Sequence, residues 1–145
     1  MKENYSYEPI KLRLSTIPVW FMLWKPIKPP YFELADRAKA GFIRTDYSYG
    51  MVEKAPFAGK WWIGYNVPEV LRADGTIARS TTIENEVLLI GNFAIYTFTG
   101  PYKELKNVYK QIQKDNPEAR EFYNCYMNDV RDVGEKGTIT KIIFR

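Results

Sequence analysis

Short segments of this sequence occur twice and in the same order. PPYFEL at 29–34 matches GPYKEL at 100–105, and NVPEVLRADGTI at 66–77 matches NDVRDVGEKGTI at 128–139. In each half, the second match directly follows a stretch rich in aromatic residues. Repetition in a fixed order indicates an internal duplication within a single domain of 1–145, with one repeat at about 1–72 and the other at about 73–145.

The two repeats are predicted to fold alike, as strand, helix, strand and strand. Pro30 and Pro101 each follow a strand-like apolar run, and each suits the first turn of a helix, where a missing N–H is harmless. Apolar residues spaced by three and four then predict helices at 30–40 and 101–114. The chain is therefore expected to be α+β, with two pseudo-symmetric β-α-β-β repeats. The strands are expected at 19–24, 60–65 and 76–82 in the first repeat, and at 93–99, 122–127 and 138–144 in the second.

Two connecting segments have a functional interpretation and a structural one. A strand, a glycine turn and a helix N-terminus can cradle phosphate, but Pro101 removes an N–H that a phosphate would use. We interpret Gly100-Pro101 as a structural corner. The segment 41–59 contains the nine residues by which the first repeat exceeds the second, because the matches lie 71 positions apart before it and 62 after it. This segment is either a surface insertion with a few packed aromatic residues or a lid over a pocket.

The composition excludes several kinds of chemistry. The chain has no histidine and a single cysteine, which removes most catalytic triads, the commonest metal ligand and any disulfide framework. We interpret Cys125 as a packed thiol, and we expect neither a metal nor a cofactor. Basic side chains are scattered among acidic ones at a net charge of +4, so direct nucleic-acid binding is not expected. The longest apolar run, 17–24, is too short for a membrane helix, and we expect a cytoplasmic protein.

The stretch FAIYTFTGPYKELKNVYKQI at 93–112 resembles the signature of the GyrI-like small-molecule-binding family. This family includes the effector-binding domains of AraC-type regulators and multidrug-sensing activators. Its strand of the type YAVFxHxGPY leads into a helix with leucine and tyrosine at the spacing of Leu105 and Tyr109, and its later strand FExYLNDP corresponds to YNCYMNDV at 123–130. The resemblance implies a curved antiparallel sheet, two main helices and a central cleft for lipophilic, often cationic, molecules.

The resemblance also implies a set of site residues. In the family, a carboxylate on the late strand matches the charge of the ligand, and aromatic rings surround it. Here Asn124 replaces that carboxylate, which weakens the case for strictly cationic ligands and counts against hydrolysis. Trp62 is taken as the counterpart of Asn124 in the first repeat. For each aromatic residue of the predicted site, burial in the core is the alternative. The predicted ligand-binding residues are Phe21, Trp62, Tyr96, Phe98, Asn124 and Tyr126.

Because the two repeats take up the chain, no room is expected for a DNA-binding helix-turn-helix unit. The first hypothesis is a stand-alone effector-binding domain that captures a lipophilic or aromatic molecule. One alternative is a hydrolase of the same family, with Tyr126 and either Glu53 or Glu86 as the acid. Another is a protein-interaction or inhibitor module. The expected partner is the small molecule; a regulatory protein or a second copy of the chain is left open, and no membrane is expected.

Overall fold

The computed structural model describes residues 5–18, 31–40, 50–54, 62–67, 70–71, 74, 77–78 and 85–145. These residues form two main helices, a short third helix, two 3-10 helices and a set of antiparallel strands. Their bounds are β1 (Ser6–Pro18), α1 (Tyr31–Ala40), β2 (Met51–Lys54), β3 (Trp62–Asn66), β4 (Val70–Leu71), β5 (Ile77–Ala78), β6 (Glu86–Thr99), η4 (Tyr102–Glu104), α2 (Leu105–Asp115), β7 (Phe122–Tyr126), α3 (Val130–Val133), η5 (Glu135–Gly137) and β8 (Ile139–Phe144).

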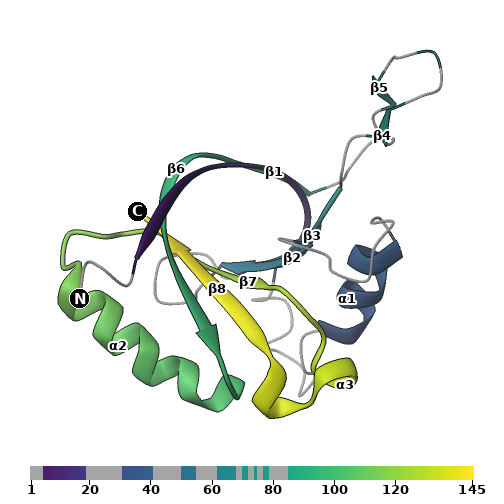
Figure 1. The fold of residues 1–145 in the computed structure, drawn as a ribbon. Coiled ribbons are helices and arrows are strands. Elements are labelled where there is room, and N and C mark those ends of the chain that lie inside the picture. The colour runs from purple at the N-terminus through teal and green to yellow at the C-terminus, as the bar shows by residue number, and fades with distance from the viewer. Residues whose placement is uncertain are drawn as a thin grey trace.

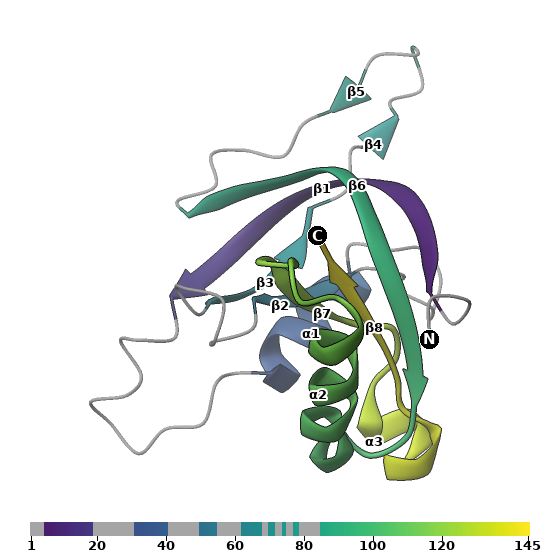
Figure 2. The same cartoon turned by 90° about the vertical axis from the view of Figure 1, so that its left-hand side faces the viewer.

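Six of the strands form a closed antiparallel barrel in the order β1, β3, β2, β7, β8, β6 and back to β1 (Figure 1). The long strand β1 bonds to β6 through residues 6–15 and to β3 through residues 14–18. Closure gives each of these six strands a partner on both sides, although the long strands β1 and β6 bond to their two partners mainly through different parts of their length. Strands β4 and β5 form a separate two-stranded sheet that projects from the barrel, on the side opposite α2 and α3 (Figure 2).

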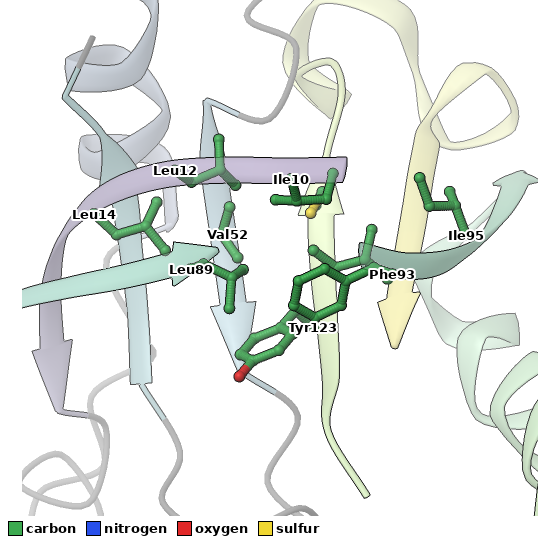
Figure 3. Packing of buried hydrophobic residues seen from close by; sticks show 10 residues of the cluster. Ile10, Leu12, Leu14, Val52, Leu89, Phe93, Ile95 and Tyr123 are labelled. Atoms are coloured by element: carbon green, nitrogen blue, oxygen red, sulfur yellow. The ribbon is translucent and has the colours of Figure 1, made fainter. Parts of the chain in front are cut away.

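The interior of the barrel is packed with apolar side chains (Figure 3). Successive side chains of a strand point to opposite faces, so alternate residues of β1 face inward together. Cys125 is one of the inward residues, and burial raises the pKa of its thiol. This burial confirms the prediction of a packed thiol. The cluster consists of Ile10, Leu12, Leu14, Val52, Leu89, Phe93, Ile95, Tyr123, Cys125 and Ile143.

Both main helices cover the outer face of the barrel (Figure 1). The buried side chains of α2 recur at spacings of four and three, so they share one helix face and pack against β6, β7 and β8. The buried face of α1 packs against β2 and β3. The two covered regions meet at the neighbouring strands β2 and β7. The packing residues are Leu105, Tyr109 and Ile112 on α2, and Leu34, Ala35 and Ala38 on α1.

The structure confirms the predicted α+β class and the antiparallel sheet, although the sheet closes into a barrel. The helix predicted at 30–40 is α1, and the helix predicted at 101–114 is η4 followed by α2. In the second half, the strands predicted at 93–99, 122–127 and 138–144 correspond to the end of β6, to β7 and to β8.

The first half differs from the prediction. The segment 41–59 is not merely an insertion or a lid, because residues 51–54 form the barrel strand β2 and Val52 lies in the core. Strand β1, at residues 6–18, is not predicted. Only Ile77 and Ala78 of the strand expected at 76–82 are described as a strand, and they lie outside the barrel. The strand expected at 19–24 lies outside the described residues.

The corner after β6 is tied to the start of β8. The N–H of Gly100 donates to the carbonyl oxygen of Thr138 at 2.9 Å, and the hydroxyl of Thr138 donates back to the Gly100 carbonyl at 2.5 Å. The φ angle of Gly100 is +150°, which favours glycine. The Gly100 N–H is therefore engaged within the fold, as expected for a structural corner.

A buried carboxylate links α1 to α3. The side chain of Asp129 is 1% exposed and accepts hydrogen bonds from the backbone and side chain of Arg131 and, at 3.0 Å, from Lys39 on α1. Arg131 also bonds to Asp36 at 2.7 Å and stacks 4.5 Å from the ring centroid of Phe32. Burial alone raises the pKa of Asp129, but the bonds from Arg131 and Lys39 outweigh it and lower the pKa below its usual value.

We expect Asp129→Asn to lower the free energy of unfolding by about 2–4 kcal/mol near neutral pH, because the amide keeps the cap of α3 but leaves two cations without their buried partner. Since the folded-state pKa is lowered, this contribution is fully present above the unfolded value of about 4 and is lost as the pH falls below it. Urea unfolding at several pH values measures the difference.

Asp132→Asn is the control: that carboxylate also bonds Lys39 but is 60% exposed, and its loss should cost less than about 1 kcal/mol. Equal losses in the two variants would contradict the role of Asp129.

Candidate functional site

A buried carboxylate, Glu53, lies at the centre of a polar cluster on the outer face of the barrel. Glu53 on β2 stands directly opposite Asn124 on β7, and Tyr126 follows on the same face of β7. The hydroxyl of Tyr126 donates to Oε1 of Glu53, and the hydroxyl of Tyr31 on α1 donates to Oε2 at 2.6 Å. The amide nitrogen of Asn124 lies 3.4 Å from Oε1. The carboxylate thus accepts hydrogen bonds from α1 and β7.

Helix α2 reaches the cluster through Tyr109. Its hydroxyl donates to Oδ1 of Asn124, while Nδ2 of the same amide lies 3.4 Å from both Glu53 and the hydroxyl oxygen of Tyr126. Burial is the main cause that raises the pKa of Tyr31, Tyr109 and Tyr126, and the negative charge of Glu53 adds to it. These phenols therefore remain protonated near neutral pH and act as donors.

Aromatic rings pack against one another beside the carboxylate. The ring of Tyr126 makes edge contacts with Tyr31, at a centroid distance of 6.1 Å, and with Tyr102 of η4, at 5.4 Å. Tyr102 is 38% exposed, whereas Tyr126 is 8% exposed and Glu53 is 5% exposed. The site therefore runs from a buried acid to a partly exposed aromatic ring.

The structure places the predicted site residues in different regions. Asn124 and Tyr126 lie together at Glu53. Tyr96 and Phe98 share their outer face, but each is separated from β7 by a residue of β8, Ile142 or Thr140 respectively. Both aromatic residues pack instead with the cluster beneath α2.

The two predicted residues from the first repeat do not join the described cluster. Trp62, taken as the counterpart of Asn124, does not lie beside it: Trp62 begins β3, which bonds to β1 and β2, and its ring contacts Tyr123 at 5.8 Å. The residues directly across from Asn124 are Glu53 on β2 and Ile142 on β8. Phe21 lies outside the described residues.

Sequence reasoning misses three members of the cluster and leaves a fourth undecided. Tyr31 and Tyr102 follow the aligned prolines in PPYFEL and GPYKEL, so the repeat itself is the signal that marks them. Tyr109 is the tyrosine of the helix pattern but is not assigned to the site. Of the two candidate acids, Glu53 is beside Tyr126, while Glu86 pairs with Arg13 at the start of β6. No motif distinguishes the two acids, because the pairing of β2 with β7 joins distant parts of the sequence.

Comparisons with known proteins add no family to this description. No family model matches the sequence, and no curated protein matches it significantly. The fold and site define an α+β barrel protein with a buried, tyrosine-bonded acid, and the GyrI-like resemblance stays a prediction. Within the described ranges, no helix is long and apolar enough to cross a membrane, and no group of three or more histidine, cysteine or acidic residues could hold a metal ion.

Proposed function

We propose that this chain is a small-molecule-binding protein of the GyrI-like type, whose ligand combines an aromatic or lipophilic body with a positively charged group. The observation that carries the proposal is the carboxylate of Glu53, buried beside Asn124 and bonded by Tyr31 and Tyr126. A carboxylate attracts a cation, and tyrosine rings add a cation–π contribution when the cation lies within about 6 Å of a ring centroid. The ligand would lie against β2 and β7, where the regions covered by α1 and α2 meet.

The proposal revises the expectation that follows from Asn124 alone. The family's acid on the late strand is absent at that position, but Glu53 brings a carboxylate to the same place from the neighbouring strand. The reasons for doubting a cationic ligand, and for doubting hydrolysis, therefore lose their force. The site therefore holds one acid, Glu53 on β2, and one amide, Asn124 on β7.

We also propose that the fold arose by internal duplication. In support, β1, α1, β2 and β3 follow one another in the same order as β6, α2, β7 and β8. β3 bonds to β1 and β2, as β8 bonds to β6 and β7. A pseudo-twofold relation would bring the two units together at the β1–β6 and β2–β7 pairs.

A hydrolase of the same family is the second candidate. The observation in its favour is the direct hydrogen bond between Glu53 and the hydroxyl of Tyr126, because an acid and a phenol in contact are the two groups this chemistry uses. Turnover of a reactive ligand, detected as product in the binding assay and abolished by Tyr126→Phe, would favour the enzyme over the binding protein.

We expect Glu53→Gln to abolish the preference for a cation. The probes are (3-hydroxyphenyl)trimethylammonium and its neutral isostere 3-tert-butylphenol, titrated separately by NMR near neutral pH. The natural protein should prefer the cation by about tenfold or more, or about 1.4 kcal/mol, and the variant should bind both probes alike. Glu86→Gln is the matched control, because it removes an acid of the same type away from the cluster. Equal affinities of the natural protein for the two probes would contradict a charged ligand at Glu53.

A further inference from the structure

The amide of Asn124 is held in one orientation by three neighbours. An amide side chain has one acceptor oxygen and one donor nitrogen. The oxygen accepts from the hydroxyl of Tyr109, and the nitrogen faces both Glu53 and the hydroxyl oxygen of Tyr126. Tyr126 itself donates to Glu53, so its oxygen is left to accept from the amide. Every donor in this ring of contacts therefore points to an acceptor.

The reversed amide would not fit these neighbours. A turn of the side chain would place its oxygen 3.4 Å from a carboxylate oxygen, which is an unfavourable contact between two acceptors. It would also place the amide nitrogen against Tyr109, whose phenol is a donor in the observed arrangement. The Tyr109 ring is 7% exposed and contacts the ring of Phe122 at a centroid distance of 6.0 Å, so packing holds its hydroxyl in place.

We propose that Tyr109 is a positioning residue for ligand recognition. By fixing the amide of Asn124, Tyr109 directs the amide N–H groups to Glu53 and Tyr126. The amide in turn holds the carboxylate of Glu53 in the position in which it contacts the positive charge of a ligand. Helix α2 thereby contributes to a site whose acid, Glu53, lies on β2 and accepts its direct hydrogen bond from a helix through Tyr31 of α1. This inference rests on the proposed function, because it assigns Tyr109 and Asn124 a role in the selectivity of that site.

The first test needs no ligand. Side-chain amide signals of Asn124, assigned by their loss in Asn124→Ala, report hydrogen exchange of its N–H protons. Tyr109→Phe should speed this exchange by about fivefold, since one hydrogen bond contributes about 1 kcal/mol. The matched control is Tyr5→Phe: Tyr5 lies in the same buried cluster and donates to Asp115 at 2.8 Å, at the end of α2. The control should leave the Asn124 signals unchanged even if it lowers stability. Unchanged exchange in Tyr109→Phe would overturn the proposal.

The second test uses the two isosteric probes and a double-mutant cycle. Tyr109→Phe should reduce the preference for the cation by about threefold to tenfold, and Tyr5→Phe should not. Because Tyr109 acts through Asn124, adding Tyr109→Phe to Asn124→Ala should reduce the preference no further. Additive losses would overturn the relay. If the natural protein binds both probes alike, the proposed function fails, while the exchange test still decides whether Tyr109 orients the amide.

Discussion

Gly64→Ala is expected to lower the free energy of unfolding by about 3 kcal/mol or more. Gly64 lies in β3, opposite Thr16 of β1 and Val52 of β2. An added Cβ would overlap the carbonyl oxygen of Ser15 and lie 2.9 Å from Cγ2 and 3.0 Å from Cα of Thr16. Two of these three atoms belong to the backbone, so no side-chain rotation can relieve the overlap. The methyl group must therefore push β1 away from β3.

Urea unfolding followed by circular dichroism measures this loss. Gly137→Ala is the matched control, because the nearest atom to its Cβ is Cβ of Val133 at 3.1 Å, so the exposed end of α3 would need to move by only a few tenths of an ångström. The control should stay within about 1 kcal/mol of the natural protein. A loss below about 1 kcal/mol for Gly64→Ala would mean that β1 and β3 do not approach each other closely, and the barrel would not close through this pair.

The parts of the fold that could be predicted are those with a local signal. Helix α2 carries Leu105, Tyr109 and Ile112 at helical spacing directly after Pro101, and each of these features is visible in a window of a few residues. Strands β7 and β8 are runs of aromatic and β-branched residues bounded by turns. Local patterns of this kind identify an element but do not say which other strand it joins.

The parts that could not be predicted depend on contacts between distant residues. Strand β2 has only four residues, MVEK, and its first three are all buried because the core covers one face and α1 packs against the other. It therefore shows no alternation of apolar and polar residues. Glu53 within it resembles any acid of a surface loop until β2 pairs with β7. The central acid of the site thus becomes visible only with the register of the barrel, while Asn124 and Tyr126 carry a recognisable motif.

Asn124→Asp is expected to destabilise the protein by about 4 kcal/mol at pH 8, although the two side chains have almost the same shape. One oxygen of the new carboxylate can accept from Tyr109, but the other replaces the amide nitrogen, 3.4 Å from Glu53. Tyr31, Tyr109 and Tyr126, three phenols beside the pair, are neutral donors and cannot neutralise a second charge. Two buried carboxylates at this separation cannot both ionise without a large cost, so the pair retains one proton.

The sign of the pH dependence follows from that proton. The folded variant binds a proton up to a higher pH than the unfolded chain, in which an aspartate titrates near about 3.9. Below that pH the variant is therefore nearly as stable as the natural protein, and it loses stability as the pH rises. A shift of about three pKa units corresponds to about 4 kcal/mol. Unfolding at pH values from 4 to 8 measures it. Asn92→Asp, at an exposed position of β6, is the control and should show no such loss.

The double variant Glu53→Gln with Asn124→Asp returns the acid to the late strand, where the GyrI-like resemblance implies that it should be. The site again holds one carboxylate and one amide, and Tyr109 can still donate to the residue at 124. We therefore expect the double variant to recover at least about 2 kcal/mol of the stability that Asn124→Asp loses at pH 8, and to prefer the cationic probe again. Double-mutant analysis of unfolding and of the paired titrations tests both expectations. If the two substitutions instead add without recovery, Glu53 and residue 124 do not share one charged site, and the acid that would recognise a cation must lie elsewhere in the chain.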